Sequence, residues 1–163
     1  MRSPPEFEPA AILDSLVRQR VDFVLIGGLA GLAHQAGWVT FDVDVVVQND
    51  EANLDRLLAA LTELGAQYDT FHQPPLLPDA RLVRSGSGPQ LFRTRYGRLD
   101  VLKEAGGETF ESLIEDAIEL EQHGQRVTCA SLEALLRMKR AANRPKDQPA
   151  IAKIEARLRE RDE

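Results

Sequence analysis

The hydrophobic pattern at the start of the chain predicts a helix, a strand and a second helix. Residues 8–20 repeat isoleucine, leucine and valine side chains at helical spacing, which indicates an amphipathic helix. Residues 21–26 follow as an almost wholly apolar run that ends at Gly27-Gly28. A helical pattern rich in Ala and Leu then covers residues 29–35. We therefore expect a buried strand joined to a helix by a glycine turn.

The next segment alternates polar and β-branched residues. Residues 41–47 read Phe-Asp-Val-Asp-Val-Val-Val, a period of two that is typical of a strand. Because successive side chains of a strand point to opposite faces, Asp42 and Asp44 share one face. Val43 and Val45 share the other, apolar face.

A leucine stripe predicts the helix that covers this apolar face. Residues 51–64 carry leucines at helical spacing, Asn49 is placed to cap the first turn, and Gly65 is placed to end the helix. We expect the stripe to pack on the sheet.

The middle of the chain is rich in short strand candidates. They lie at residues 67–72, 81–84, 91–95 and 98–103, separated by a proline-rich stretch at 74–78 and by Ser-Gly-Ser-Gly-Pro at 85–89. These candidates predict antiparallel hairpins.

The end of the chain returns to helices. A short helix over 109–116 precedes two strands, 118–122 and 126–129, and Ser131 caps a helix over 132–142 that is followed by a second over about 147–159. The order of elements predicts an α/β (α+β) fold with a mixed sheet flanked by helices. We expect an α/β core at residues 1–130 and a C-terminal helical pair at residues 131–163 packed on it.

Composition makes this an ordinary globular chain of 163 residues, with 43% hydrophobic and 28% charged residues. The apolar run at residues 21–33 is too short to cross a bilayer, and the first ten residues lack the pattern of a signal peptide. The lone Cys129 excludes an internal disulfide and fits a reducing compartment. We expect a cytoplasmic protein without a membrane partner.

Charge is unevenly distributed along the chain. The net charge of −6 argues against a protein that coats nucleic acid. Residues 137–161, however, carry nine Lys or Arg side chains against three acids. The C-terminal helices are thus the part of the chain suited to contact RNA.

The candidate chemistry gathers around the glycine pair and three acids. Glycines between a strand and a helix let the backbone approach a phosphate closely. Asp42 and Asp44, on one strand face, are oxygen ligands of the kind that Mg²⁺ takes. Asp100 lies in the apolar run Leu-Asp-Val-Leu, where an ionised carboxylate needs a cation or a hydrogen-bond partner.

These features together resemble the signature of the nucleotidyltransferase superfamily, in which a Gly-Gly or Gly-Ser turn precedes an Asp-x-Asp strand and a third Asp follows. The sequence Thr-Phe-Asp-Val-Asp at 40–44, with Leu-Leu-Arg-Met-Lys at 135–139 and Arg-Pro-Lys-Asp at 144–147, is most similar to the AbiEii-type group of bacterial nucleotidyltransferase toxins and its uncharacterised relatives. The similarity covers roughly residues 20–160.

The resemblance implies a nucleotidyltransferase-type fold and a metal-dependent enzyme. It would move a nucleoside monophosphate from an NTP to an acceptor, which could be tRNA or another RNA, a protein or a small molecule, and an antitoxin protein could be its partner. Two Mg²⁺ ions would be held by the three carboxylates. The implied residues are Asp42, Asp44 and Asp100 as metal ligands and catalytic groups, Lys139 at the triphosphate, and Gly27, Gly28, Leu29, Thr40 and Asp147 in nucleotide binding, where Asp147 would orient Lys146 or Arg144.

Two departures from the pattern support a second interpretation. Trp38 stands where relatives commonly have an arginine, and no serine follows the glycine pair, so backbone amides of Gly28 and Leu29 remain as phosphate donors. The alternative is a non-catalytic module that keeps the fold to sense a nucleotide or bind a protein.

Structural explanations also compete at single residues. The strand acids can occupy a solvent-facing edge, and Asp100 can form a salt bridge with Arg98 or Arg81. Lys139 can belong to a solvated helical face. Trp38 can be a core residue or can stack on a base or acceptor, and the glycine pair can be a tight turn only. His34, at a helix end, is expected to make a structural hydrogen bond.

Overall fold

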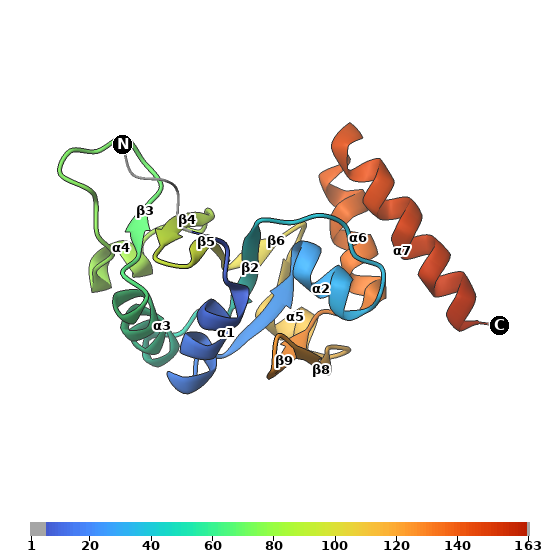
Figure 1. The fold of residues 1–163 in the computed structure, drawn as a ribbon, viewed down its shortest axis with the longest axis horizontal. Coiled ribbons are helices and arrows are strands. Elements are labelled where there is room, and N and C mark those ends of the chain that lie inside the picture. Colours follow the sequence, from blue (N-terminus) through green and yellow to red (C-terminus); the bar gives the residue numbers. More distant parts are fainter. Residues whose placement is uncertain (1–5, 163) are drawn as a thin grey trace.

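A computed structural model describes residues 6–162. Its helices are α1 (Pro9–Arg18), α2 (Gly27–Ala33), α3 (Glu51–Glu63), α4 (Ala80–Arg84), α5 (Phe110–Ile114), α6 (Leu132–Ala142), the 3-10 turn η1 (Pro145–Asp147) and α7 (Gln148–Arg161). Its strands are β1 (Phe23–Ile26), β2 (Asp42–Val47), β3 (Gln67–Tyr68), β4 (Gln90–Thr94), β5 (Gly97–Leu102), β6 (Glu104–Ala105), β7 (Glu108–Thr109), β8 (Ile118–Gln122) and β9 (Gln125–Cys129). Figure 1 shows their arrangement.

The strands form one mixed sheet, which confirms the predicted fold class. Seven strands lie in the order β3-β4-β5-β2-β1-β9-β8, and β6 and β7 form a separate two-stranded ribbon. The central strand β2 pairs antiparallel with β1 and parallel with β5. The expected hairpins are present as β4–β5 and β8–β9. Both strands that carry the candidate acids therefore lie side by side in the centre of the sheet.

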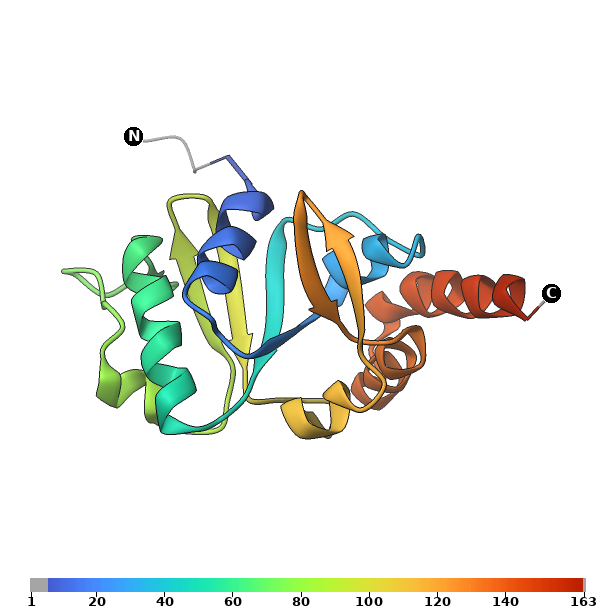
Figure 2. The same ribbon diagram turned by 90° about the horizontal axis from the view of Figure 1, so that it is seen from below.

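Helices α1 and α3 pack together against the sheet, as Figures 1 and 2 show. The leucines that predicted α3 are in the core, with Leu57 and Leu61 almost fully buried. Val43 and Val45 of β2 are also fully buried. Burial of one face of β2 leaves its other face, with the two acids, free to line a site.

The predicted cap of α3 is wrong by one residue. Asp50, not Asn49, takes the cap position, and its side chain accepts a hydrogen bond from the backbone N–H of Asn53. Asn53 is itself buried and donates to the carbonyls of Asp22 and Gln48, so the start of α3 is tied to the end of the β1–β2 pair where β1 begins and β2 ends. A capping aspartate also places negative charge at the positive end of the helix dipole.

The strand predicted at residues 81–84 is also wrong, because this segment is helix α4. The side chain of Asp79 caps it by accepting from the N–H of Leu82 at 2.8 Å. Only Val83 of this five-residue helix is buried, so its apolar pattern is too short to distinguish a helix from a strand. The strand predicted at 67–72 is shorter than expected and ends at Tyr68.

The structure also bears on Cys129, on the N-terminal segment and on the expected absence of a membrane span. Cys129 is fully buried, and burial raises its pKa to about 12, so it packs as a small apolar side chain. Part of the N-terminal segment considered for a signal peptide, residues 1–5, lies outside the described residues. Among residues 6–162, no helix is both long and apolar enough to cross a membrane.

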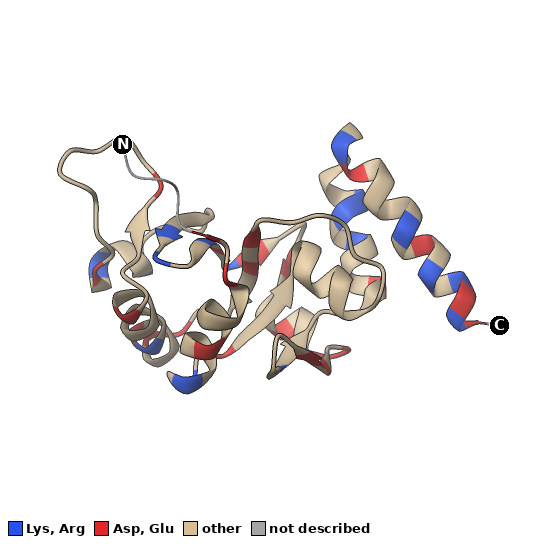
Figure 3. Ribbon diagram, viewed as in Figure 1, with Lys and Arg blue, Asp and Glu red and all other residues tan. Residues whose placement is uncertain are grey.

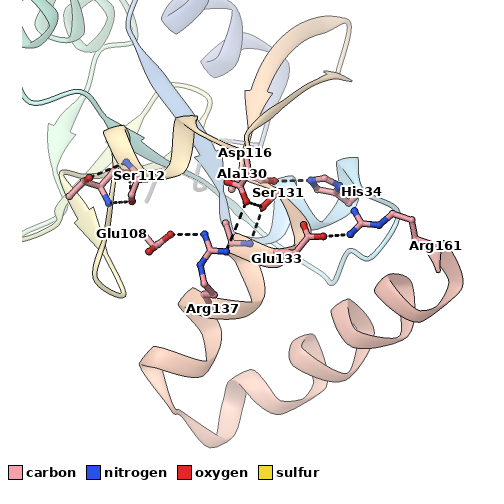
Figure 4. A network of polar contacts seen from close by, with 11 residues as sticks. His34, Glu108, Ser112, Asp116, Ala130, Ser131, Glu133, Arg137 and Arg161 are labelled. Carbon is pink, nitrogen blue, oxygen red and sulfur yellow. Dashed lines mark hydrogen bonds and ion pairs between the residues drawn. The ribbon is translucent and has the colours of Figure 1, made fainter.

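A polar network fixes helix α6 against the rest of the fold (Figure 4). Ser131 caps the helix as predicted, accepting from the N–H of Ala134 and donating to Asp116 at 2.8 Å. Arg137 binds Glu108 at 2.8 Å, and Glu133 pairs with Arg161 of α7. His34 makes its expected structural hydrogen bond, with Nε2 at 2.8 Å from the carbonyl of Ala130. The network holds the helix that carries Lys139 next to the sheet.

Candidate metal and nucleotide site

The register of β2 and β5 brings the three predicted acids together. Asp44 of β2 lies directly beside Asp100 of β5 in the parallel pair, and Asp42 lies two residues earlier on the same face of β2. One carboxylate oxygen from each of the three residues lies within 4.8 Å of the others. All three residues are partly buried. Acids that are 56 residues apart in the sequence thus form a single cluster.

Burial and mutual repulsion make this cluster costly in its ionised form. Burial, followed by the charges of Asp42 and Asp100, raises the pKa of Asp44 to about 8. The pKa of Asp100 is also raised, first by burial and then by Asp42, while Arg98 opposes the shift. A positive ion among the three oxygens would relieve both effects.

An oxygen of Asp100 lacks the partner that a buried acceptor needs. Its Oδ1 atom is buried and accepts no hydrogen bond from the described residues. The ion pair considered from the sequence is present but long, since Arg98 Nη2 lies 3.7 Å from this oxygen. Arg81, the other considered partner, is not paired with Asp100 in the described part of the chain. An unsatisfied oxygen within a cluster of carboxylates fits a divalent cation such as Mg²⁺.

The glycine pair forms the first turn of α2 and lies against the acids. Gly27 has a φ of +71°, and a Cβ atom at this position would come within 2.4 Å of Asp44 Oδ2. A Cβ atom at Gly28 would lie 2.6 Å from the Cβ of Thr40. Both positions therefore require glycine, the first for its backbone conformation and its close approach to Asp44, the second for close approach alone.

Thr40 and Trp38 approach the cluster from the loop between α2 and β2. The hydroxyl of Thr40 donates a hydrogen bond to Asp42 Oδ1 at 3.0 Å. The ring of Trp38 is partly buried and packs against the core, and Lys139 Nζ lies 5.2 Å from its centroid, within the range of a cation–π contact. Trp38 is therefore part core residue and part wall of the site.

Lys139 and Asp147 meet at the site, whereas Lys146 does not join them. Asp147 is only 3% exposed and binds Lys139 Nζ at 3.0 Å and Arg144 Nε at 2.7 Å. Burial opposes ionisation of Asp147, but the hydrogen bonds from Arg144 and Lys139 outweigh it and lower the pKa of Asp147. Of the two residues that Asp147 was expected to orient, Lys146 and Arg144, it contacts Arg144. Lys139 is its second partner, and Lys139 is thus not a freely solvated residue.

Two cavities meet at the acids. The larger, about 410 Å³, is lined by Asp44, Asp100, Glu104, Arg144 and apolar side chains from several strands and from α6. The other, about 330 Å³, is lined by the glycine pair, residues 38–42, Asp44, Arg98 and Lys139. Gly27, Asp44 and Lys139 border both. Two molecules could therefore reach the carboxylates from two sides.

Leu29, whose backbone N–H was a predicted phosphate donor, is the third residue of α2. Its side chain is buried, and its carbonyl accepts a hydrogen bond from Gln122 at 3.2 Å. Leu29 does not line either cavity, whereas Gly28 lines the smaller one. Of the two backbone donors expected from the sequence, Gly28 is the one that borders the site.

Sequence reasoning missed Arg98 and Glu104 as site residues. Arg98 was considered only as a partner of Asp100, yet it lines the smaller cavity. The signal was available, because residues 98 and 100 share one face of a strand with period two. Glu104 lies beyond the predicted strand, and no local pattern connects it with the acids.

Solved structures with the same fold include an antibiotic-resistance factor and an antibiotic adenylyltransferase. The antibiotic-resistance factor ANT(2'')-Ia matches with a TM-score of 0.61 and 18% identity over 92% of this chain and 80% of that protein. The lincosamide antibiotic adenylyltransferase LnuA, bound to lincomycin, matches with a TM-score of 0.61 and 16% identity over 93% and 98%. The chain has the nucleotidyltransferase fold.

A second structure of ANT(2'')-Ia also has the same fold. ANT(2'')-Ia in complex with adenylyl-2''-tobramycin aligns with a TM-score of 0.60 and 16% identity over 91% of this chain and 86% of that protein. No protein-family model and no curated protein matches the sequence. At these identities the nucleotidyltransferase likeness establishes the fold alone.

Proposed function

We propose that the protein is a Mg²⁺-dependent nucleotidyltransferase that moves a nucleoside monophosphate from an NTP to the hydroxyl of an acceptor. The observation that carries the proposal is the cluster of Asp42, Asp44 and Asp100, whose oxygens lie within 4.8 Å of one another. Mg²⁺ bound there would neutralise the triphosphate and promote loss of the acceptor proton. The likeness to LnuA, an adenylyltransferase, supports the same chemistry.

The chain's own residues would have distinct tasks in this reaction. The acceptor oxygen would attack the α-phosphate, the bond to the β-phosphate would break, and pyrophosphate would leave. Asp100, as a carboxylate of the proposed metal site, is suited to take the acceptor proton. Gly27 and Gly28 would let the phosphates approach the backbone closely, and Thr40 would hold Asp42 in place.

Lys139 would contribute positive charge next to the triphosphate. Its Nζ atom is held by Asp147 at 3.0 Å and by the face of Trp38, and it borders both cavities. Asp147 would act by positioning Lys139 and Arg144. A fixed cation costs less reorganisation during the reaction than a mobile one.

Different features of the chain and of its structural neighbours support three kinds of acceptor or role. ANT(2'')-Ia with adenylyl-2''-tobramycin supports a small-molecule acceptor. The basic C-terminal helices support RNA, although Arg140, Arg157 and Arg161 form ion pairs within the chain. The similarity of residues 40–44 and 135–147 to AbiEii-type toxins supports a toxin that is controlled by an antitoxin protein.

The experiment uses purified protein, Mg²⁺, cell extract and NTPs labelled at the α-phosphate. We expect one component of the extract to become labelled, and the label to fall at least about 100-fold in Asp42→Ala, which removes a metal ligand. Nuclease, protease and size filtration then assign the label to RNA, protein or a small molecule. Equal labelling by wild type and Asp42→Ala would refute the proposal.

A second candidate is a nucleotide-sensing or protein-binding module without turnover. It is favoured by Trp38, which occupies a position where an arginine is expected. The ring of Trp38 makes a cation–π contact with Lys139. Calorimetry separates the two functions. Mg²⁺-dependent NTP binding without labelling of any component of the extract would support the module.

A further inference from the structure

Arg98 is a cation beside the carboxylate cluster, at the cavity of about 330 Å³. It lies two residues before Asp100 on β5 and is the register partner of Asp42 across the parallel pair. Because strand side chains alternate, Arg98, Asp100, Asp42 and Asp44 belong to one face of the sheet. Its side chain is 45% exposed and lines the cavity of about 330 Å³ together with the glycine pair.

The guanidinium of Arg98 is weakly engaged within the chain. Its two ion pairs, with Asp69 Oδ2 and Asp100 Oδ1, are both 3.7 Å long. Within residues 6–162 its side chain forms no hydrogen bond, although a guanidinium carries five N–H donors. Lys139, the other cation of this cavity, is already bound to Asp147 at 3.0 Å. The N–H donors of the Arg98 guanidinium are therefore free to bind a ligand.

Its surroundings define the chemistry of that ligand. A guanidinium binds phosphate or carboxylate oxygens with paired, charge-assisted hydrogen bonds. The cavity is bordered by glycines that admit a phosphate and by the acids that would hold Mg²⁺. A carboxylate ligand would add a fourth carboxylate to three that already repel one another. A phosphate of an NTP instead binds together with Mg²⁺, and the acids and the phosphate share that ion as ligands.

We propose that Arg98 is a phosphate-binding residue of this site, taking either the triphosphate of the NTP or a phosphate of a phosphorylated acceptor. The inference rests on the proposed function. It also gives the site an arginine, on β5, although the loop position before Thr40 is occupied by Trp38.

The neighbouring strand supplies a matched control. Arg93 of β4 is the register partner of Arg98, is 50% exposed and also pairs with Asp69, at 3.2 Å. Arg93 lines neither cavity at the acids. Arg93→Gln therefore removes the same charge and the same kind of ion pair outside the site.

The test measures binding by calorimetry at saturating Mg²⁺, with two probes. Inorganic tripolyphosphate represents the nucleotide's phosphates, and a 5'-phosphorylated dinucleotide, compared with its unphosphorylated form, represents a phosphorylated acceptor. We expect Arg98→Gln to weaken one probe about 10- to 100-fold, the effect of a charge-assisted hydrogen bond. Arg98→Lys should recover part of the affinity, and Arg93→Gln should retain it.

The two probes separate the sources of the phosphate. A loss confined to tripolyphosphate identifies the NTP, and a loss confined to the phosphorylated dinucleotide identifies the acceptor. Unchanged binding of both probes in a folded Arg98→Gln protein, or an equal loss in Arg93→Gln, would overturn the inference. A wild-type protein that binds neither probe would instead count against the proposed function.

Discussion

At the scale of single residues, the site consists of groups that destabilise one another in the absence of ligand. Asp44 is held between two other acids, and Asp100 has a buried oxygen without a hydrogen-bond partner among the described residues. Such arrangements persist where function requires them, at a cost in stability. The cost can be measured.

Asp44→Asn should stabilise the protein in the absence of divalent cations. The folded pKa of Asp44, about 8, exceeds its ordinary value of 3.8, so this group's contribution to stability falls as pH rises through that window. Asparagine has no such titration. We expect thermal melts at pH 8 to show a gain of about 1 kcal/mol or more, roughly 2–4 °C, which shrinks towards pH 4.

Mg²⁺ provides the matched control for this prediction. It should raise the melting temperature of the wild type, because it binds the folded state, and should raise that of Asp44→Asn much less. A less stable Asp44→Asn protein at pH 8 without Mg²⁺ would show that repulsion among the acids is not the dominant effect.

Residue types and spacing predicted part of this site. The period of two in residues 41–47 placed Asp42 and Asp44 on one face, as the structure shows. The pairing of Asp44 with Asp100 could not be derived, because it depends on the register of two strands far apart in sequence. Arg98 could have been found by applying the same period to β5.

At the scale of elements, long periodic segments were predicted best. Helices α3 and α6 have strong apolar stripes and match the predictions closely. Helix α4 has five residues, only one of them buried, so its pattern carries too little information to distinguish a helix from a strand. Its capping residue, Asp79, was the available signal.

The cap of α3 gives a direct test at this scale. Asp50→Ala removes the hydrogen bond from the N–H of Asn53, which is 2.8 Å long, and should cost about 1 kcal/mol of stability. Asn49→Ala, at the position that the sequence suggested, should change stability by less than about 0.5 kcal/mol. Urea unfolding of both variants measures this difference, and the reverse order would restore Asn49 as the cap.

At the scale of the whole molecule, the sheet order unites segments from the entire chain. Strand β2 lies between β1 and β5, and α6 brings Lys139 to the acids from beyond residue 130. Figure 3 shows that acidic residues interrupt the run of basic residues along α7. Long-range pairing of this kind follows from the fold and cannot be read from local periodicity.

The division into a core at residues 1–130 and a helical segment at residues 131–163 remains a proposal. Helix α6 contributes Leu135 and Met138 to the hydrophobic core and to the wall of the larger cavity. The helical segment would therefore complete the site as well as cover the sheet.

The central claim is that Asp42, Asp44 and Asp100 together hold a metal ion beside a bound nucleotide. Crystals grown with Mn²⁺ and a non-hydrolysable NTP analogue test it most directly, since the anomalous signal of Mn²⁺ locates the ion. We expect an anomalous peak within coordination distance of all three carboxylates, with the triphosphate next to it. A nucleotide bound elsewhere, or a peak that does not touch these residues, would contradict it.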